Sequence, residues 1–427
     1  MSDLWEMADL PTTTNVRPLL ENLFRRESGK LTASLTRFFG SKHLELAEDV
    51  VQDTLLKAMR EWPFKGIPDD PVAWLHRVAK NGAIDRLRRD ARGMELMQEH
   101  APMLRSEWTL ASTVHAELSE GAIVDDQLRM FFACCHPALP ADQQVALVLK
   151  TLCGFSVPEI ARAFLTNEET INKRLHRARR TFRELGKLEI PQGDALNDRL
   201  EQVLSAIYLL FNEGYQSTTH AELIREELIE EALRLNHLLL ARAPLVRPQV
   251  HALHALMCYH ASRTDARRDP DGAIILLRDQ DRSCWDHAMI ELGNEHLNLA
   301  SEGNTLTSYH VEAAIASIYA NAANYGRTDW AAIVHLYDSL LRFKPAPLIR
   351  VNRAIAIGLA SGAEEGLRAI EAVEGLRDHG LYHAAHGDML AELGRKEEAR
   401  DAYEKAMRFM KSEAEAELMA GKLRALG

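Results

Sequence analysis

The sequence predicts an all-α protein, and three features of its residue pattern indicate this fold class. Apolar residues recur at intervals of three and four positions through nearly every long segment of the 427-residue chain. Alternation of apolar and polar residues, which is typical of strands, is scarce. Clusters of Pro, Gly, Asp and Ser interrupt the helical pattern, for example at 63–71 and 186–197. These breaks predict two small helical domains at 15–92 and 125–187, a linker at 93–124 and a C-terminal helical block at 196–427.

The composition excludes several classes of protein. Hydrophobic residues make up 46% of the chain, but no stretch of about 18 apolar residues is present that would cross a membrane. The N-terminal segment MSDLWEMADLPTTT has acidic residues and no apolar core, so we expect no signal peptide and a cytoplasmic protein. Five cysteines without a C-x-x-C pair predict neither a disulfide framework nor a zinc site, and no cofactor is expected. With a formal net charge of −11, a nucleic-acid-binding protein must concentrate its Lys and Arg residues locally.

The segment HLELAEDVVQDTLLKAMREW, at 43–62, has the pattern of an amphipathic helix with one acidic face. Glu45, Asp49 and Asp53 follow one another at intervals of four residues, and Gln52 lies beside them. This row is either a solvated helix face or a docking surface for a basic partner. The apolar stripe of the helix is expected to consist of Val51, Leu55, Ala58, Met59 and Trp62.

The next helical segment, VAWLHRVAKNGAIDRLRRDAR, is strongly basic within an acidic protein. Only Asp85 and Asp90 oppose its six cations, which favours a surface that contacts phosphates. Trp74 can stack on a base or can simply anchor the hydrophobic core, and Asn81 can form hydrogen bonds with a base edge. The six cations are Arg77, Lys80, Arg86, Arg88, Arg89 and Arg92.

The segment at 138–187 carries the most specific signal in the chain, a helix-turn-helix pattern. A supporting helix ends at Gly154, a short helix follows, and Asn167 is a suitable N-cap for the basic helix EETINKRLHRARRTFREL. Side chains at the start of such a helix meet base edges in a major groove, although an ordinary basic surface helix is the alternative. We expect Thr170, Asn172 and Lys173 at the base edges, a basic footprint of Arg174, Arg177, Arg179, Arg180, Arg183 and Lys187, and a core face of Ile171, Leu175, Ala178 and Phe182.

The acidic helix, the segment AWLHRVAKNGAIDRLRR and the helix-turn-helix ending RLHRARR together resemble one family, the bacterial RNA polymerase sigma factors of the extracytoplasmic-function, sigma-70-like group. The resemblance covers 15–187, with region 2 at 15–92 and region 4 at 125–187. It implies a protein that is not itself an enzyme. Such a protein binds the β′ and β subunits of core RNA polymerase and directs the polymerase to promoter DNA.

The resemblance also implies roles for individual residues. Glu169 departs from the family pattern, in which a small residue is common at the start of the recognition helix, and this leaves open which bases are read. Three residues match the part that docks on the clamp helices of β′, namely Asp49, Gln52 and Asp53. Six match the part that opens and reads the −10 element, namely Trp74, Lys80, Asn81, Arg86, Arg88 and Arg89. Five match the helix that reads the −35 element, namely Thr170, Asn172, Lys173, Arg174 and Arg177.

The stretch FFACCHPALP, which precedes the helix-turn-helix, is similar to a sequence in the sigma subgroup that carries a large C-terminal extension. Successive residues on a helix diverge by about 100°, so Cys134 and Cys135 are poorly placed to share one metal. We expect both to be small buried residues, with a redox or metal role as the alternative. His136 and Pro137 are expected to stop the helix.

The C-terminal block, 196–427, is predicted to be a helical-repeat domain. Gly387, Ala399, Tyr403 and Ala406 have the spacing of small and aromatic residues in a tetratricopeptide repeat. Stacked helix pairs form a curved array with a concave binding face, and the alternative is a packed helical domain without a ligand. The charged segment RDQDRSCWDHAMI lacks a nucleophile–base motif and a phosphate loop, so interhelical salt bridges are favoured over catalysis.

Three functional hypotheses follow from the sequence. In the first, the chain is a sigma factor whose C-terminal domain contacts the sigma domains and regulates them. In the second, it is a helix-turn-helix regulator that does not recruit polymerase. In the third, the C-terminal block is a ligand sensor or an enzyme. The acidic row and the basic segment at 74–89 favour the first hypothesis, because a simple regulator needs neither.

Overall fold

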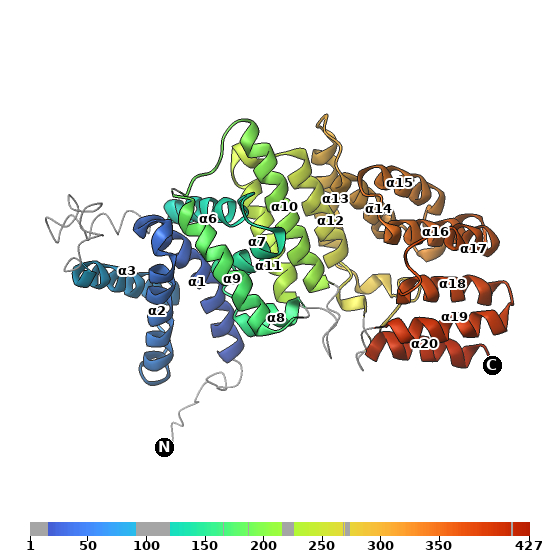
Figure 1. The fold of residues 1–427 in the computed structure, drawn as a ribbon, viewed down its shortest axis with the longest axis horizontal. Helices are drawn as coiled ribbons and strands as arrows, with labels where there is room; N and C mark the ends of the chain where they lie inside the picture. The colour runs from blue at the N-terminus through green and yellow to red at the C-terminus, as the bar shows by residue number, and fades with distance from the viewer. Residues whose placement is uncertain are drawn as a thin grey trace, which may run out of the picture. The chain divides into compact units, whose positions relative to one another are not determined.

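The computed structural model describes residues 16–90, 120–164, 166–186, 188–215, 226–267, 269, 274–410 and 413–427. Every regular element in these ranges is a helix, which confirms the predicted fold class (Figure 1). None of the described helices is both long enough and apolar enough to cross a membrane. The chain forms two compact units that divide between Ala206 and Ile207, within α10 (Asp194–Tyr215).

The first unit begins with a bundle of three helices. α1 (Val16–Phe39) leads through the short helix η1 (Ser41–His43) into α2 (Leu44–Lys65), and α3 (Pro71–Asp90) packs on both long helices. Asp70 caps α3, because its carboxylate accepts a hydrogen bond from the Ala73 N–H at 2.9 Å. In the shared core, the ring of Trp62 lies 5.4 Å from the rings of both Phe24 and Trp74.

The helix-turn-helix lies in the same unit and packs against this bundle. α6 (Glu120–Cys134) runs along α1 and is followed by α7 (Ala141–Thr151), α8 (Val157–Ala163) and α9 (Glu168–Glu184). The chain after α7 approaches α1 so closely that a β-carbon at Gly29 would lie 1.8 Å from the carbonyl oxygen of Leu152. Arg37 of α1 also forms a 3.0 Å ion pair with the buried carboxylate of Asp126 on α6. Most of the linker expected at 93–124 falls outside the described residues, and 120–124 belong to α6.

Cys134 and Cys135 lie in the core at the end of α6, as expected from the sequence. Both side chains are fully buried, and the Cys134 thiol contacts the Thr151 hydroxyl at 3.5 Å. Burial raises the pKa of Cys134 to about 12, so this thiol stays protonated at neutral pH and is a poor nucleophile. The helix stops before His136, whose Nδ1 accepts a hydrogen bond from the Ala138 N–H at 3.1 Å.

The second unit starts in α10 and is built around α12 (Pro248–Ala261), whose residues 252–259 are all buried. This helix packs against α11 (Glu226–Leu240), α13 (His287–Ser301) and α14 (Ser308–Asn321). The contact with α13 is tight because a glycine is present there: a β-carbon at Gly293 would lie 2.8 Å from the ring of Tyr259. The helices of this part are α11 (Glu226–Leu240), α12 (Pro248–Ala261), α13 (His287–Ser301), α14 (Ser308–Asn321) and α15 (Trp330–Phe343), with short helices η2 (Ala243–Leu245), η3 (Asp265–Arg267), η4 (Arg282–Cys284) and η5 (Tyr325–Arg327).

The last five helices form the repeat that the sequence predicts. Ala399, Tyr403 and Ala406 are buried, and a β-carbon at Gly387 would lie 2.7 Å from the ring of Tyr403. The predicted pattern of small and aromatic residues therefore holds α18 (Gly380–Glu392) against α19 (Lys396–Phe409) at short range (Figure 1). The five helices are α16 (Pro347–Ser361), α17 (Ala363–Glu371), α18 (Gly380–Glu392), α19 (Lys396–Phe409) and α20 (Glu413–Ala425).

Candidate polymerase and DNA interfaces

The helix α9 begins at the cap that the sequence predicts. The side-chain oxygen of Asn167 accepts hydrogen bonds from the Thr170 N–H and the Thr170 hydroxyl, both at 2.8 Å. The core face is also as expected, because all four of its residues are at most 1% exposed. These residues are Ile171, Leu175, Ala178 and Phe182.

The first half of α9 presents its polar face to solvent. Asn172, Lys173 and Arg177 are exposed, whereas Thr170 and Arg174 are partly buried. Glu169 and the exposed His176 join the three exposed residues around a shallow surface hollow of about 490 Å³. His176 was not among the predicted site residues, although its position four residues after Asn172 places it on the same helix face.

Two acidic residues lie against this basic face. The Lys173 ammonium is 2.6 Å from the Glu169 carboxylate, and the Arg174 guanidinium is 2.9 Å from Asp142 on α7. The unusual acidic residue at the start of α9 therefore neutralises a neighbouring cation. The first pair is exposed and the second is partly exposed, so separating either pair costs little free energy.

The residues expected at the −10 element occupy several environments on α3. Asn81 is exposed, and Lys80 is partly buried. Trp74 is partly buried against Trp62, which agrees with its alternative role as a core anchor. The Arg86 guanidinium lies 3.4 Å from the Asp53 carboxylate of α2. Arg88 and Arg89 lie on α3, but their side chains fall outside the described residues, as do Arg92 and Lys187.

The acidic row of α2 is exposed and continues into an apolar surface. Asp49, Gln52 and Asp53 all face solvent. Leu56 and Met59 lie further along the same helix face and are 47% and 62% exposed. Met59 was expected in the buried apolar stripe of this helix, but it is exposed, because three-residue spacing places it on the face of Leu56 rather than that of Ala58. An exposed face that combines apolar and acidic side chains is typical of a protein interaction site.

The second half of α9 is held against α2 by two ion pairs, which we call the latch. Arg179 lies 2.8 Å from Glu48, and Arg183 lies 3.0 Å from Glu45. Burial raises the pKa of Glu48, while Arg179 and Lys150 oppose this shift by favouring the charged carboxylate. Two cations that the sequence assigned to a DNA-binding footprint are thus bound to the helix that carries the acidic row.

Four family models match successive parts of the chain. They are Sigma-70 region 2 at 23–93, Sigma-70 region 4 at 132–182, a family of unknown function (DUF6596) at 199–301 and a tetratricopeptide repeat-like domain at 349–427. The ECF RNA polymerase sigma factor SigM of Mycobacterium tuberculosis (strain H37Rv) is 31% identical over 175 residues, which is 40% of this chain and 80% of SigM. The chain belongs to the ECF sigma factor family.

Other relatives of this sigma factor differ in how much of it they cover. An uncharacterized protein of Rhizobium meliloti (strain 1021) is 38% identical over 386 residues, which is 90% of each chain, and so includes most of the C-terminal unit. The ECF RNA polymerase sigma factor SigE of Mycolicibacterium smegmatis is 27% identical over 193 residues, or 43% of this sigma factor and 71% of SigE. No solved structure gives a significant match to the chain.

Proposed function

We propose that this sigma factor binds core RNA polymerase and directs it to a set of promoters, acting through binding and not through catalysis. The observation that best supports this function is the exposed face of α2. There Asp49, Gln52 and Asp53 adjoin the apolar Leu56 and Met59. We assign this face to the clamp helices of the polymerase β′ subunit. Its carboxylates provide specificity and its apolar side chains provide buried area.

The DNA contacts are assigned to two separate surfaces. On α3, Trp74, Lys80, Asn81, Arg86, Arg88 and Arg89 take the opened −10 element, where an aromatic ring, an amide and cations suit single-stranded bases and their phosphates. On α9, Asn172, Lys173 and Arg177 read the −35 element, supported by Thr170 and Arg174. Exposed donors at the start of a helix are suited to base edges in a major groove.

The latch makes the polymerase surface on α2 and the DNA surface on α9 compete, because it ties these two helices together. While Arg179 and Arg183 are bound to α2, α9 is fixed beside the helix that we assign to polymerase. We propose that the latch opens when polymerase and promoter bind, so that the cations are transferred from carboxylates to phosphates. The C-terminal unit then regulates this step. This role is supported by its size and by an exposed repeat surface, described below, that neither the −10 nor the −35 assignment uses.

Transcription from purified components tests the proposed function. We expect the full chain to permit promoter-dependent initiation by core polymerase and to form a complex with it, whereas core alone does neither. The double substitution Asp49→Lys with Asp53→Lys should abolish the complex but leave duplex DNA binding by α9 unchanged. Glu404→Lys, at an exposed position of the second unit, is the matched control. Promoter binding by a chain that never binds core polymerase would instead identify a conventional helix-turn-helix regulator.

A further inference from the structure

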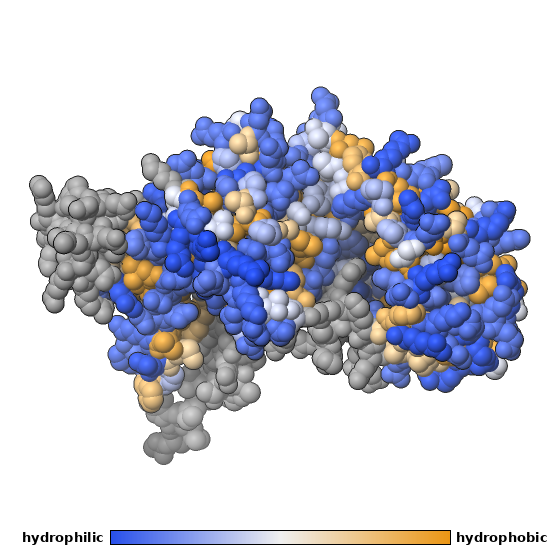
Figure 2. All heavy atoms as spheres, in the orientation of Figure 1, coloured by the Kyte–Doolittle hydropathy of each residue, from blue (hydrophilic) through white to orange (hydrophobic). Residues whose placement is uncertain are grey.

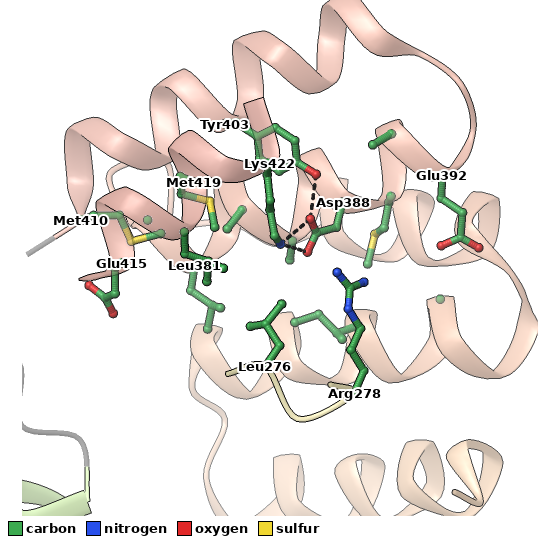
Figure 3. Close-up of a pocket in the computed structure, with 18 of the residues that line it drawn as sticks. Leu276, Arg278, Leu381, Asp388, Glu392, Tyr403, Met410, Glu415, Met419 and Lys422 are labelled. Atoms are coloured by element: carbon green, nitrogen blue, oxygen red, sulfur yellow. Dashed lines mark hydrogen bonds and ion pairs between the residues drawn. The ribbon is translucent and has the colours of Figure 1, made fainter. Parts of the chain in front are cut away.

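The second unit contains a large cavity between its last helices and the segment 274–278 (Figure 3). Its volume is about 1310 Å³, which exceeds the roughly 300–1,000 Å³ of most small-molecule sites. Residues of α16, α18 and α20 line one side, and Ile274, Leu276 and Arg278 line another. The helices belong to the repeat-like region and the segment belongs to the family of unknown function. We call this cavity the composite groove, because neither region forms it alone.

Hydrogen bonds hold in position the wall of the groove that the segment 274–278 forms. The Ile275 N–H donates a hydrogen bond to the Arg267 carbonyl at 2.9 Å, and the buried Gln280 side chain donates one to the Ile275 carbonyl at 3.1 Å. Figure 3 shows Leu276 and Arg278 on the side of the cavity opposite Asp388. The segment is therefore a fixed part of the site.

Exposed apolar side chains gather in this groove. Leu348 and Leu359 of α16, Leu381 of α18 and Phe409 of α19 all line it, and each is 36% to 40% exposed. Figure 2 shows apolar residues at the surface among charged ones over these last helices. Contiguous apolar surface of this kind, bordered by polar groups, is characteristic of protein interaction sites. Met410, which is partly buried, adds a flexible side chain that can adapt to a bound surface, and the buried Met389 and Met419 complete the apolar lining.

The charges in the groove are arranged unevenly. At its centre, Asp388 accepts hydrogen bonds from the Tyr403 hydroxyl at 2.7 Å and from the Lys422 ammonium at 2.6 Å, so these groups satisfy one another. Each end carries an exposed carboxylate that lines the groove: Asp378 lies just before α18, and Glu392 is its last residue. With a rise of about 1.5 Å per residue, the two positions lie about 20 Å apart along α18. Cations also line the groove, and one of them, Lys396, donates a hydrogen bond to the Leu426 carbonyl at 3.1 Å.

We propose that the composite groove binds a segment of a partner protein that has an apolar centre and a Lys or Arg near each end. The apolar side chains of the bound segment cover Leu359 and Leu381, and its two cations pair with Asp378 and Glu392. A span of about 20 Å corresponds to about 14 helical residues or about 6 extended residues. This binding does not require polymerase or DNA, so its test is independent of the proposed transcription function.

Selection of a random library of displayed peptides on the full-length protein tests this proposal, with peptides of about 16 residues to cover the helical length. We expect enriched peptides to carry an apolar centre and basic ends. Their affinity should fall at least about tenfold with Leu381→Glu, which places a charge in an apolar contact, and with Glu392→Lys, which reverses an end charge.

Two substitutions outside the groove are matched controls. Leu393 is 39% exposed, against 37% for Leu381, and Glu404 is exposed like Glu392. Leu393→Glu and Glu404→Lys should leave the affinity unchanged. The proposal is overturned if no peptide is enriched, if the enriched peptides have acidic ends, or if the controls lose as much affinity as the groove variants. Self-association that Leu381→Glu abolishes, measured by sedimentation velocity, would also overturn it, because the occupant would be a second copy of the chain.

Discussion

Replacing Arg179 by alanine should release α9 from α2. The Arg179 and Glu48 side chains are 23% and 14% exposed. The pair is thus intermediate between buried pairs, where loss of one partner costs about 3–5 kcal/mol, and exposed pairs worth about 0.2–1 kcal/mol. We expect Arg179→Ala to weaken the docking of α9 on α2 by about 2 kcal/mol, because Lys150 still favours the charged form of Glu48. At about 1.4 kcal/mol per factor of ten, the equilibrium between docked and released α9 shifts about 30-fold.

The second ion pair of the latch provides an internal comparison. The Arg183 and Glu45 side chains are 44% and 61% exposed, so Arg183→Ala should weaken the contact by at most about 1 kcal/mol, or about fivefold. Combining Arg179→Glu with Glu48→Arg restores opposite charges with the partners exchanged. This double variant should recover most of the docked population that Arg179→Glu loses.

The distance between α2 and α9 can be measured with two spin labels. Met59→Cys and Arg180→Cys place the labels at exposed positions, in a Cys284→Ser background because Cys284 is the exposed cysteine and the other four are buried. Pulsed electron paramagnetic resonance should show a single short distance for the parent protein and an added longer population for Arg179→Ala. Equal distance distributions for Arg179→Ala and Arg183→Ala would contradict this prediction, because the partly buried pair would then contribute no more than the exposed one.

Three further predictions concern stability. Asn167→Ala should lower the free energy of unfolding by about 1 kcal/mol and speed hydrogen exchange at the start of α9. Asn167→Asp keeps the capping oxygen and should leave both unchanged. Equal protection from exchange in the two variants would exclude a role for the cap. Gly387→Ala should destabilise the protein by about 1–3 kcal/mol, measured by urea unfolding, because its β-carbon would lie 2.7 Å from the Tyr403 ring. Gly421→Ala is the control: its β-carbon would have its nearest neighbour at 3.9 Å, so this change should stabilise the protein by up to about 1 kcal/mol. Burial and neighbouring histidines lower the pKa of His254 from 6.5 to about 3, so only the unfolded state takes up this proton between pH 7 and pH 5. The free energy of unfolding should therefore fall by about 2 kcal/mol over that interval through this group alone, and His254→Gln should reduce the slope of the unfolding free energy against pH.

The elements that the sequence predicts well are those whose information is local. The helix α9 is an example, because its cap and its four core residues follow from spacing within 18 residues of chain, Asn167 to Glu184. The repeat around Gly387 and Tyr403 was predictable for the same reason. Met59 was not, because spacing of three or four residues leaves the edge of an apolar stripe ambiguous by one side chain.

The features that escaped prediction connect distant parts of the chain. Arg179 and Glu48 are 131 residues apart in sequence, and their ion pair depends on how two helical bundles pack. The segment that contains Leu276 and Arg278 reaches α18 in the same way. A charge pattern shows that a residue is basic, but it does not show whether the residue faces a phosphate or a carboxylate. This is why Arg179 and Arg183 were assigned only to DNA.

The contact at Gly29 has a consequence for genetics. Any side chain at this position would act as a wedge between α1 and the chain after α7, since the carbonyl oxygen of Leu152 occupies the space that a β-carbon needs. Such a wedge would separate the two bundles without touching a residue assigned to polymerase or promoter. Because the proposed function requires these bundles to separate, a selection for alleles with raised transcription should recover changes at residue 29. A map of such alleles drawn from partner contacts alone would leave this position unexplained.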